Sequence, residues 1–143
     1  MENKFLQEGR SLFQKIQSMS VPEKIEFAHK GTKEARTILI RDPNKMVQMA
    51  VVTSPKITEG EVFALANNRN VDEEVLKYIS NRREWMKNYQ VKVALVNNPK
   101  TQLPQALSLV PYLVRRDLLA LTKSKAIPRI ISAAAQKRLQ AAK

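Results

Sequence analysis

The stretch Ala94-Leu95-Val96-Asn97-Asn98-Pro99-Lys100-Thr101 decides the fold, because it ends an apolar segment in a polar turn with proline and then starts a new segment. Stretches of the same kind begin at residues 38, 64 and 120, and a partial copy begins at residue 50. The four main starts are separated by 26, 30 and 26 residues. A period of this size fits one helix–turn–helix hairpin, which buries its apolar face by stacking on its neighbours. Such turns also recur in all-α proteins without repeats, and this alternative stays open.

Helical periodicity dominates the chain. An amphipathic helix is predicted near residues 3–18 from the spacing of Phe5, Leu12, Phe13, Ile16 and Met19. Helix-start signals, in which a short polar residue precedes an acid, begin at Ser20, Thr58, Asn70 and, more weakly, Asn81. Gly31 is placed to end the second helix. Runs of period two with glycine turns are missing, so we predict an all-α protein of short helices.

The Ala94–Thr101 stretch and its weaker copies resemble the helix junctions of HEAT-like and leucine-rich-repeat-variant α-solenoids. The resemblance covers about residues 20–141 and lies in the pattern of residue types. It implies a right-handed stack of short antiparallel helix hairpins with a concave face, of the kind used to bind proteins or nucleic acids. The last unit lacks the Asn-Pro turn, and Pro111 interrupts the helix after Pro104. Residues 1–19 fall outside the pattern, so we expect an N-terminal helix at 1–19 and a repeat domain at 20–143.

The net charge of +12 is confined to the second half of the chain. Residues 1–76 contain 11 basic and 11 acidic residues, whereas residues 77–143 contain 14 basic residues and two acids, Glu84 and Asp117. A surface of one charge sign attracts anionic partners, although many such surfaces are only solvated. The sequence therefore points to nucleic acid, an acidic protein or an acidic membrane, with a merely solvated surface as the alternative.

Several classes of function are excluded or disfavoured by composition. The chain has no cysteine, one histidine and three scattered glycines, which removes disulfides, cysteine–zinc sites, thiol catalysis and a phosphate-cradling glycine loop. No long apolar run and no signal-peptide pattern occurs, so a cytoplasmic protein without a membrane span is expected. His29, near the end of the second predicted helix, is interpreted as structural. We expect no catalytic residue, metal or cofactor.

One basic segment combines cations with aromatic residues. It contains the only tryptophan, Trp85, and Tyr89 four residues later, which a continuous helix places on one face. Interleaved cations and rings suit nucleic acid, because cations neutralise phosphates while rings stack on bases. The favoured alternative makes both rings core anchors, with the cations on the wet side.

A second basic group follows at Arg115 and Arg116, beside Asp117, a predicted N-cap, and continues to Arg129. In a stack of hairpins, successive turns line one edge, so that cations from four turns form a basic ridge. The ridge residues are Lys56, Arg69, Lys100 and Lys125.

Two other features have simpler interpretations. Asp72-Glu73-Glu74 is the densest acidic cluster, and we interpret it as first-turn residues opposing a helix dipole rather than as a metal site. The last predicted helix, about 127–142, is basic and amphipathic, and we expect it to close the stack rather than to dock on a membrane.

The sequence thus favours a non-enzymatic helical repeat module that binds an anionic macromolecule, with nucleic acid ahead of an acidic protein. The predicted phosphate-contacting residues are Arg82, Arg83, Lys87, Lys92, Lys100, Arg115, Arg116, Lys123, Lys125 and Arg129. Nothing resembles a base-reading motif, so weak sequence specificity is expected. A scaffold for an acidic protein is the alternative. Some HEAT-like proteins are DNA glycosylases, and there the resemblance would assign Glu84 and Trp85 to a flipped base, although no motif aligns.

Overall fold

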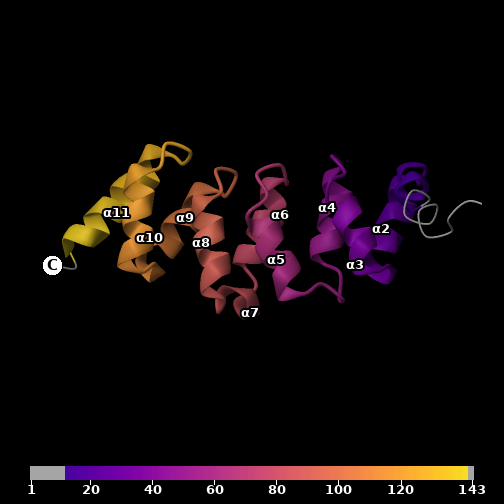
Figure 1. Ribbon diagram of the computed structural model, residues 1–143, viewed down its shortest axis with the longest axis horizontal. Coiled ribbons are helices and arrows are strands. Elements are labelled where there is room, and N and C mark those ends of the chain that lie inside the picture. Colours follow the sequence, from indigo (N-terminus) through magenta and orange to yellow (C-terminus); the bar gives the residue numbers. More distant parts are fainter. Residues whose placement is uncertain (1–11, 142–143) are drawn as a thin grey trace, which may run out of the picture. The chain divides into compact units, whose positions relative to one another are not determined.

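The computed structural model describes residues 12–141, and these are all-helical without any strand (Figure 1). This confirms the predicted all-α class. By its contacts the chain divides into two compact units, Met1–Ile57 and Thr58–Lys143. The longest of the helices α2 to α11 is α11 (Arg129–Ala141), which has 13 residues. Helices this short have little stability alone, so each depends on burying an apolar face against its neighbours.

Unit 1 contains a helical segment at residues 12–17 followed by α2 (Val21–Lys30), α3 (Lys33–Leu39) and α4 (Lys45–Val52). The predicted helix near 3–18 is thus helical at 12–17, and its earlier part, with Phe5, lies outside the described residues. Helix α2 packs against both α3 and α4. The core joins the first helical segment to the other three through Ile16, Ala28, Ala35, Leu39, Val47, Ala50 and Val51.

The start and end of α2 follow the sequence prediction. The Ser20 side chain accepts the Glu23 N–H while the Glu23 carboxylate accepts the Ser20 N–H, which forms a capping box. Gly31 ends the helix, and its N–H donates to the Phe27 carbonyl. A Cβ at Gly31 would lie 2.6 Å from that carbonyl oxygen, so the close approach requires glycine.

Unit 2 contains the remaining elements in chain order: α5 (Glu59–Ala66), α6 (Glu73–Ser80), α7 (Arg83–Met86), α8 (Tyr89–Asn97), α9 (Leu103–Leu109), a 3₁₀ turn η1 (Val110–Tyr112), α10 (Arg115–Lys123) and α11 (Arg129–Ala141). Helix α5 packs on α6 and α8, α8 on α9, and α10 on α11. Its fully buried side chains include Val62, Leu76, Ile79, Leu95, Leu121 and Ile131. The 3₁₀ turn at Pro111 accounts for the predicted interruption after Pro104.

Two of the four predicted helix starts are correct, and two are wrong by a residue or two. Thr58 caps α5 in a capping box with Glu61, as predicted. Helix α6 is capped by Asp72 rather than Asn70, because the Asn70 N–H bonds back to Asn68 and Val71 is buried ahead of the helix. Helix α7 follows Arg82, not Asn81, whose N–H still bonds to α6.

The predicted junction stretches share one hydrogen-bonded turn. At each, a short polar side chain accepts the backbone N–H two residues later at 2.8–3.4 Å, and its own N–H donates to the carbonyl three residues before. These residues are Asp42, Ser54, Asn68, Asn98 and Ser124. Four residues after Ser54, Asn68 and Asn98 comes the N-cap position of the next helix, at Thr58, Asp72 and Gln102, and the side chains of Thr58 and Asp72 accept a backbone N–H there. The recurring sequence pattern is therefore also a recurring local structure.

Asn98 additionally connects two of these turns. Its side chain is 4% exposed, and its Nδ2 donates to the Ala66 and Asn68 carbonyls at 2.8 and 3.0 Å. Its Oδ1 accepts the Lys100 N–H at 2.9 Å. The carboxamide therefore holds the turn after α8 against the turn after α5.

Unit 1 uses a different side chain for the same purpose. The buried guanidinium of Arg36 donates to the Gly31 carbonyl at 3.2 Å and to the Lys56 carbonyl at 3.4 Å. The turn after α2 is thereby held against the turn after α4. In both units, a buried donor spans two turns that are far apart in the sequence.

Replacing Asn98 by alanine tests how much this connection contributes. Asn98→Ala removes three hydrogen bonds and leaves buried carbonyls without a donor, so we expect the free energy of unfolding to fall by about 2–4 kcal/mol. Asn98→Ser keeps the acceptor for the Lys100 N–H and should lose about half as much. Urea denaturation measures both.

The control is Asn97→Ala, because Asn97 is half-buried and bonds only to Val93 in its own helix. It should cost about 1 kcal/mol or less. Equal losses for Asn97→Ala and Asn98→Ala would contradict a special role for Asn98.

Candidate anion-binding surface

The predicted phosphate-contacting residues fall at two edges of unit 2. Figure 1 shows the turns α5–α6, α8–α9 and α10–α11 at one edge, and α7 with the start of α10 at the other. Near the turns lie four residues, here called the turn cations: Lys100, Lys123, Lys125 and Arg129. The opposite-edge cations flank α7 or open α10, and they are Arg82, Arg83, Lys87, Arg115 and Arg116. Lys92 lies within α8, between the two edges.

These cations are available to a partner. All nine edge cations are exposed and Lys92 is half-buried. Arg116 pairs with the adjacent Asp117 at 3.4 Å, and none of the other nine forms an ion pair with a described residue. Exposed cations of this kind can neutralise the phosphates of a polyanion, which releases the counterions condensed on that polyanion.

Arg82 is held by two aromatic rings. Its guanidinium carbon lies 5.2 Å from the Trp85 ring centre and 5.7 Å from that of Tyr78, distances typical of cation–π contacts. The two rings are themselves 5.9 Å apart and tilted by 59°. This arrangement restricts the arginine while leaving its N–H groups exposed.

Trp85 is 8% exposed, so its interpretation as a packing residue is confirmed. The prediction that Trp85 and Tyr89 share one helical face is wrong. Helix α7 ends at Met86, and Asn88 caps a new helix by accepting the Gln90 and Val91 N–H groups. The two rings therefore belong to different helices.

Tyr89 connects the start of α8 to the start of α10. Its hydroxyl donates to the Asp117 carboxylate at 2.5 Å and accepts the Val114 N–H at 2.9 Å. Helix α10 accordingly begins after Val114, and the prediction that Asp117 is its N-cap is wrong: Asp117 lies in the first turn. The predicted placement of Arg115 and Arg116 at a helix start is correct. Through Tyr89, these arginines lie on the same edge as Lys87.

The same contact shifts two ionisations. The hydrogen bond from Tyr89 lowers the pKa of Asp117, and Arg116 adds to the effect. Burial raises the pKa of Tyr89, and its bond to the Asp117 carboxylate raises it further. At any pH between the pKa of Asp117 and that of Tyr89, Asp117 is charged and Tyr89 is neutral. One of the two acids in residues 77–143 is thereby engaged internally, which leaves Glu84 as the exposed acid of that region.

Two aromatic contacts were missed by the sequence interpretation. Tyr78 holds Arg82 from the preceding helix, and the Lys92 ammonium lies 4.7 Å from the centre of the exposed Tyr112 ring. The four-residue spacing of Tyr78 and Arg82 was the available signal for the first. Nothing in the sequence indicated the second, because it joins α8 to η1.

The remaining candidates take structural roles in the described residues. The Asp72 side chain accepts the Glu74 N–H as the cap of α6, and Glu73 and Glu74 lie in the first turn, as predicted. No group of residues in the described part of the chain has the composition of a metal site. His29 lies near the end of α2, with Nε2 3.3 Å from the Thr53 hydroxyl.

The predicted ridge joins residues of both units. In unit 2, Arg69 and Lys100 are exposed and occupy the two turns that Asn98 holds together. Lys125 is exposed in the third turn at the same edge of Figure 1. Lys56 belongs to unit 1, where its ammonium donates to the Lys30 carbonyl.

Comparisons with known proteins give no match to any family model, curated protein or solved structure. Within residues 12–141, no helix has both the length and the apolar character to cross a membrane.

Replacing Tyr89 by phenylalanine tests the connection between α8 and α10. Tyr89→Phe leaves the Val114 N–H without its acceptor and removes one of the donors to Asp117, so the free energy of unfolding should fall by about 1–3 kcal/mol at pH 7. The pKa of Asp117 is lowered in the folded protein, so its contribution is present above the unfolded pKa of about 4 and is lost as the pH falls through the folded pKa. The difference in the free energy of unfolding between the wild type and Tyr89→Phe should therefore become smaller below about pH 4.

Tyr112→Phe is the matched control, since Tyr112 is 63% exposed and its hydroxyl has no partner among the described residues. It should change stability by less than about 0.5 kcal/mol at every pH. Urea titrations at pH 3 to 7 measure both variants. A pH-independent Tyr89→Phe effect would mean that the bond to Asp117 contributes nothing.

Proposed function

We propose that this chain is a non-enzymatic α-helical repeat module that binds nucleic acid through its phosphates. The observation that carries the proposal is the charge of residues 77–143, where 14 cations face two acids, one of them held internally by Tyr89. Nine of the predicted contact residues are exposed, and eight of these nine have no ion-pair partner among the described residues. Phosphate neutralisation supplies affinity without reading sequence, which fits the absence of a base-reading motif.

A stack of hairpins is the proposed architecture. The five turns that share one hydrogen-bond pattern support it, since a stack of hairpins repeats one local structure at its junctions. We propose residues 20–143 as the repeat domain and residues 1–19 as its cap, supported by Ile16 in the core of unit 1. A cytoplasmic location is also proposed, with which the lack of cysteine agrees.

We assign the main phosphate path to the opposite edge. Five cations lie there, Arg82 is held by two rings, and the Tyr89 contacts join the start of α10 to that of α8. Side chains that are restricted before binding lose less conformational entropy when a phosphate arrives. The turn cations extend the positive field without comparable restriction.

Salt titration tests the proposal. With a duplex oligonucleotide and about six phosphate contacts, log K should fall against log salt with a slope near −5. The triple variant Arg83→Gln, Lys87→Gln, Arg115→Gln should bind more weakly and reduce the slope by about 3, because each contact contributes about one. Fluorescence anisotropy at several salt concentrations measures both quantities.

Two triple variants with the same change in charge are the controls. Lys100→Gln, Lys123→Gln, Lys125→Gln should reduce the slope less, and Lys15→Gln, Lys33→Gln, Lys45→Gln in unit 1 should leave it nearly unchanged. Equal effects for all three triples would show that net charge alone is responsible. A wild-type slope near zero would contradict nucleic-acid binding, and salt-sensitive binding to poly-glutamate alone would favour an acidic protein partner.

Arg82→Lys tests the aromatic contacts of Arg82. Lysine keeps the charge but cannot lie flat on the two rings, so we expect oligonucleotide affinity to fall about three- to tenfold with an unchanged salt slope. Arg83→Lys, the neighbouring exposed position without ring contacts, should change affinity less than about twofold. The fluorescence of Trp85, the only tryptophan, should change on binding in the wild type. Equal affinities for the two lysine variants would assign no role to the rings.

A further inference from the structure

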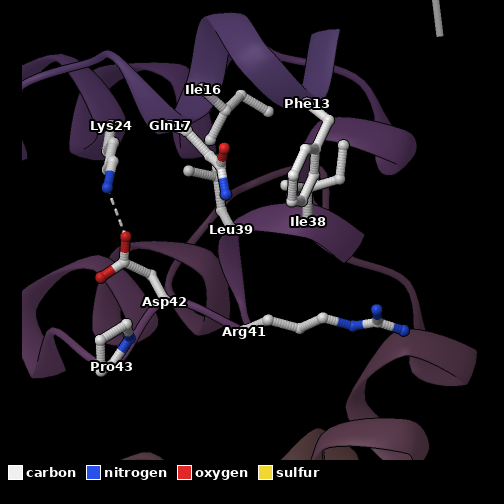
Figure 2. Close-up of a pocket in the computed structure, with 9 residues that line it drawn as sticks. All are labelled: Phe13, Ile16, Gln17, Lys24, Ile38, Leu39, Arg41, Asp42 and Pro43. Carbon is white, nitrogen blue, oxygen red and sulfur yellow. Dashed lines mark hydrogen bonds and ion pairs between the residues drawn. The ribbon is translucent and has the colours of Figure 1, made fainter. Parts of the chain in front are cut away.

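A pocket of about 550 Å³ lies within unit 1, and none of its lining residues is among those proposed to contact nucleic acid (Figure 2). It opens between the helical segment at 12–17, the middle of α2 and the junction between α3 and α4. Its volume is in the range of small-molecule sites, which is about 300–1,000 Å³. All of its lining residues belong to one compact unit, so its geometry is internal to that unit.

One side of the pocket is apolar. Phe13 and Ile38 overlap in the view of Figure 2, and Ile16 and Leu39 lie to their left. Ile16 and Leu39 belong to the buried core, whereas Phe13 is 47% exposed. Covering this exposed ring with an apolar group is favourable, because it removes apolar surface from water.

The other side of the pocket carries cations in excess. Lys24 and Asp42 form an ion pair at 2.5 Å, with side chains 16% and 14% exposed. Both oxygens of Asp42 have donors, Lys24 on one and the Asn44 N–H on the other. Its negative charge is therefore already satisfied, and it presents little to a ligand.

Arg41 provides the charge that is not satisfied. It is exposed, its side chain makes no ion pair or hydrogen bond with a described residue, and its guanidinium points away from the Lys24–Asp42 pair in Figure 2. A guanidinium offers only donors and matches two oxygens of a carboxylate or phosphate at once. The Gln17 amide lies between the ion pair and Phe13 and adds a polar group.

We propose that this pocket binds a small organic anion: an apolar body covers Phe13 and Ile38, and an anionic oxygen group lies on Arg41. The shared chemistry is a carboxylate or a phosphate ester on an aromatic or aliphatic body. The pocket shares no residue with the proposed nucleic-acid surface, and neither proposal depends on the other.

The test uses the full chain and three probes with similar rings, followed by amide chemical shifts. 4-Phenylbutyrate carries a carboxylate, phenyl phosphate carries a phosphate ester, and 4-phenylbutan-1-ol is uncharged. For ligands of about 12 heavy atoms we expect dissociation constants near the millimolar range. At least one anion should produce saturable chemical-shift changes at residues around the pocket. Its dissociation constant should be at least about tenfold lower than that of the alcohol. Whichever anion binds more tightly identifies the oxygen group.

Variants locate the two halves of the site. Arg41→Ala should weaken the anion about tenfold or more, and Phe13→Ala should weaken it and the alcohol alike. Lys45→Ala removes an exposed cation of α4 that does not line the pocket and should have no effect. Both test residues are exposed, and thermal melting confirms that each variant is folded. The assignment would be overturned if neither anion bound more tightly than the alcohol. It would also be overturned if Arg41→Ala bound the anion as tightly as the wild type does, or if the chemical-shift changes lay outside the pocket.

Discussion

The packing of these short helices depends on hydrogen bonds made at the turns between them. Within residues 12–141 no helix is long enough to fix its own position, and apolar faces can slide past one another in several ways. A polar side chain that must satisfy backbone groups of the turn permits far fewer arrangements. Asn98 shows the effect most clearly, since its carboxamide bonds to its own turn and to the turn after α5. With the helices of unit 2 held in this way, the exposed cations predicted to contact phosphate lie at one edge or the other.

Charge and packing are separate in residues 77–141. The buried side chains that join the helices are mostly aliphatic, while nearly all cations of the second half remain in solvent. The exceptions connect the two: Tyr89 fixes the arginines that open α10 beside the start of α8, and Tyr78 with Trp85 restricts Arg82. These contacts position charge without neutralising it, which is the requirement for a surface that binds phosphate.

Local signals in the sequence predicted much of the fold. Capping boxes at Ser20 and Thr58 and the end of α2 at Gly31 depend on residues within one turn of each other, so the sequence alone contains them. One error involves a distant partner, and the others are local. The start of α10 depends on Tyr89, 25 residues before Val114, and the break after Met86 has neither proline nor glycine to mark it.

The candidate site shows the same division. Composition identified the cations, because exposure is the ordinary state of lysine and arginine. Their separation into two edges depends on the direction in which each helix runs. That direction cannot be predicted from the spacing of apolar residues in the sequence. The pocket beside Arg41 also escaped prediction, since it combines three segments of unit 1 whose side chains are unremarkable individually.

The most direct test of the account is amide chemical-shift mapping of the full chain with a single-stranded oligonucleotide at low salt. The account predicts shifts concentrated at residues 82–88 and 114–117, reversed by added salt, with the amides of unit 1 unaffected. Shifts confined to the turns at 98–100 and 124–126, or spread evenly over both units, would contradict a phosphate-binding edge organised by Tyr89 and Trp85.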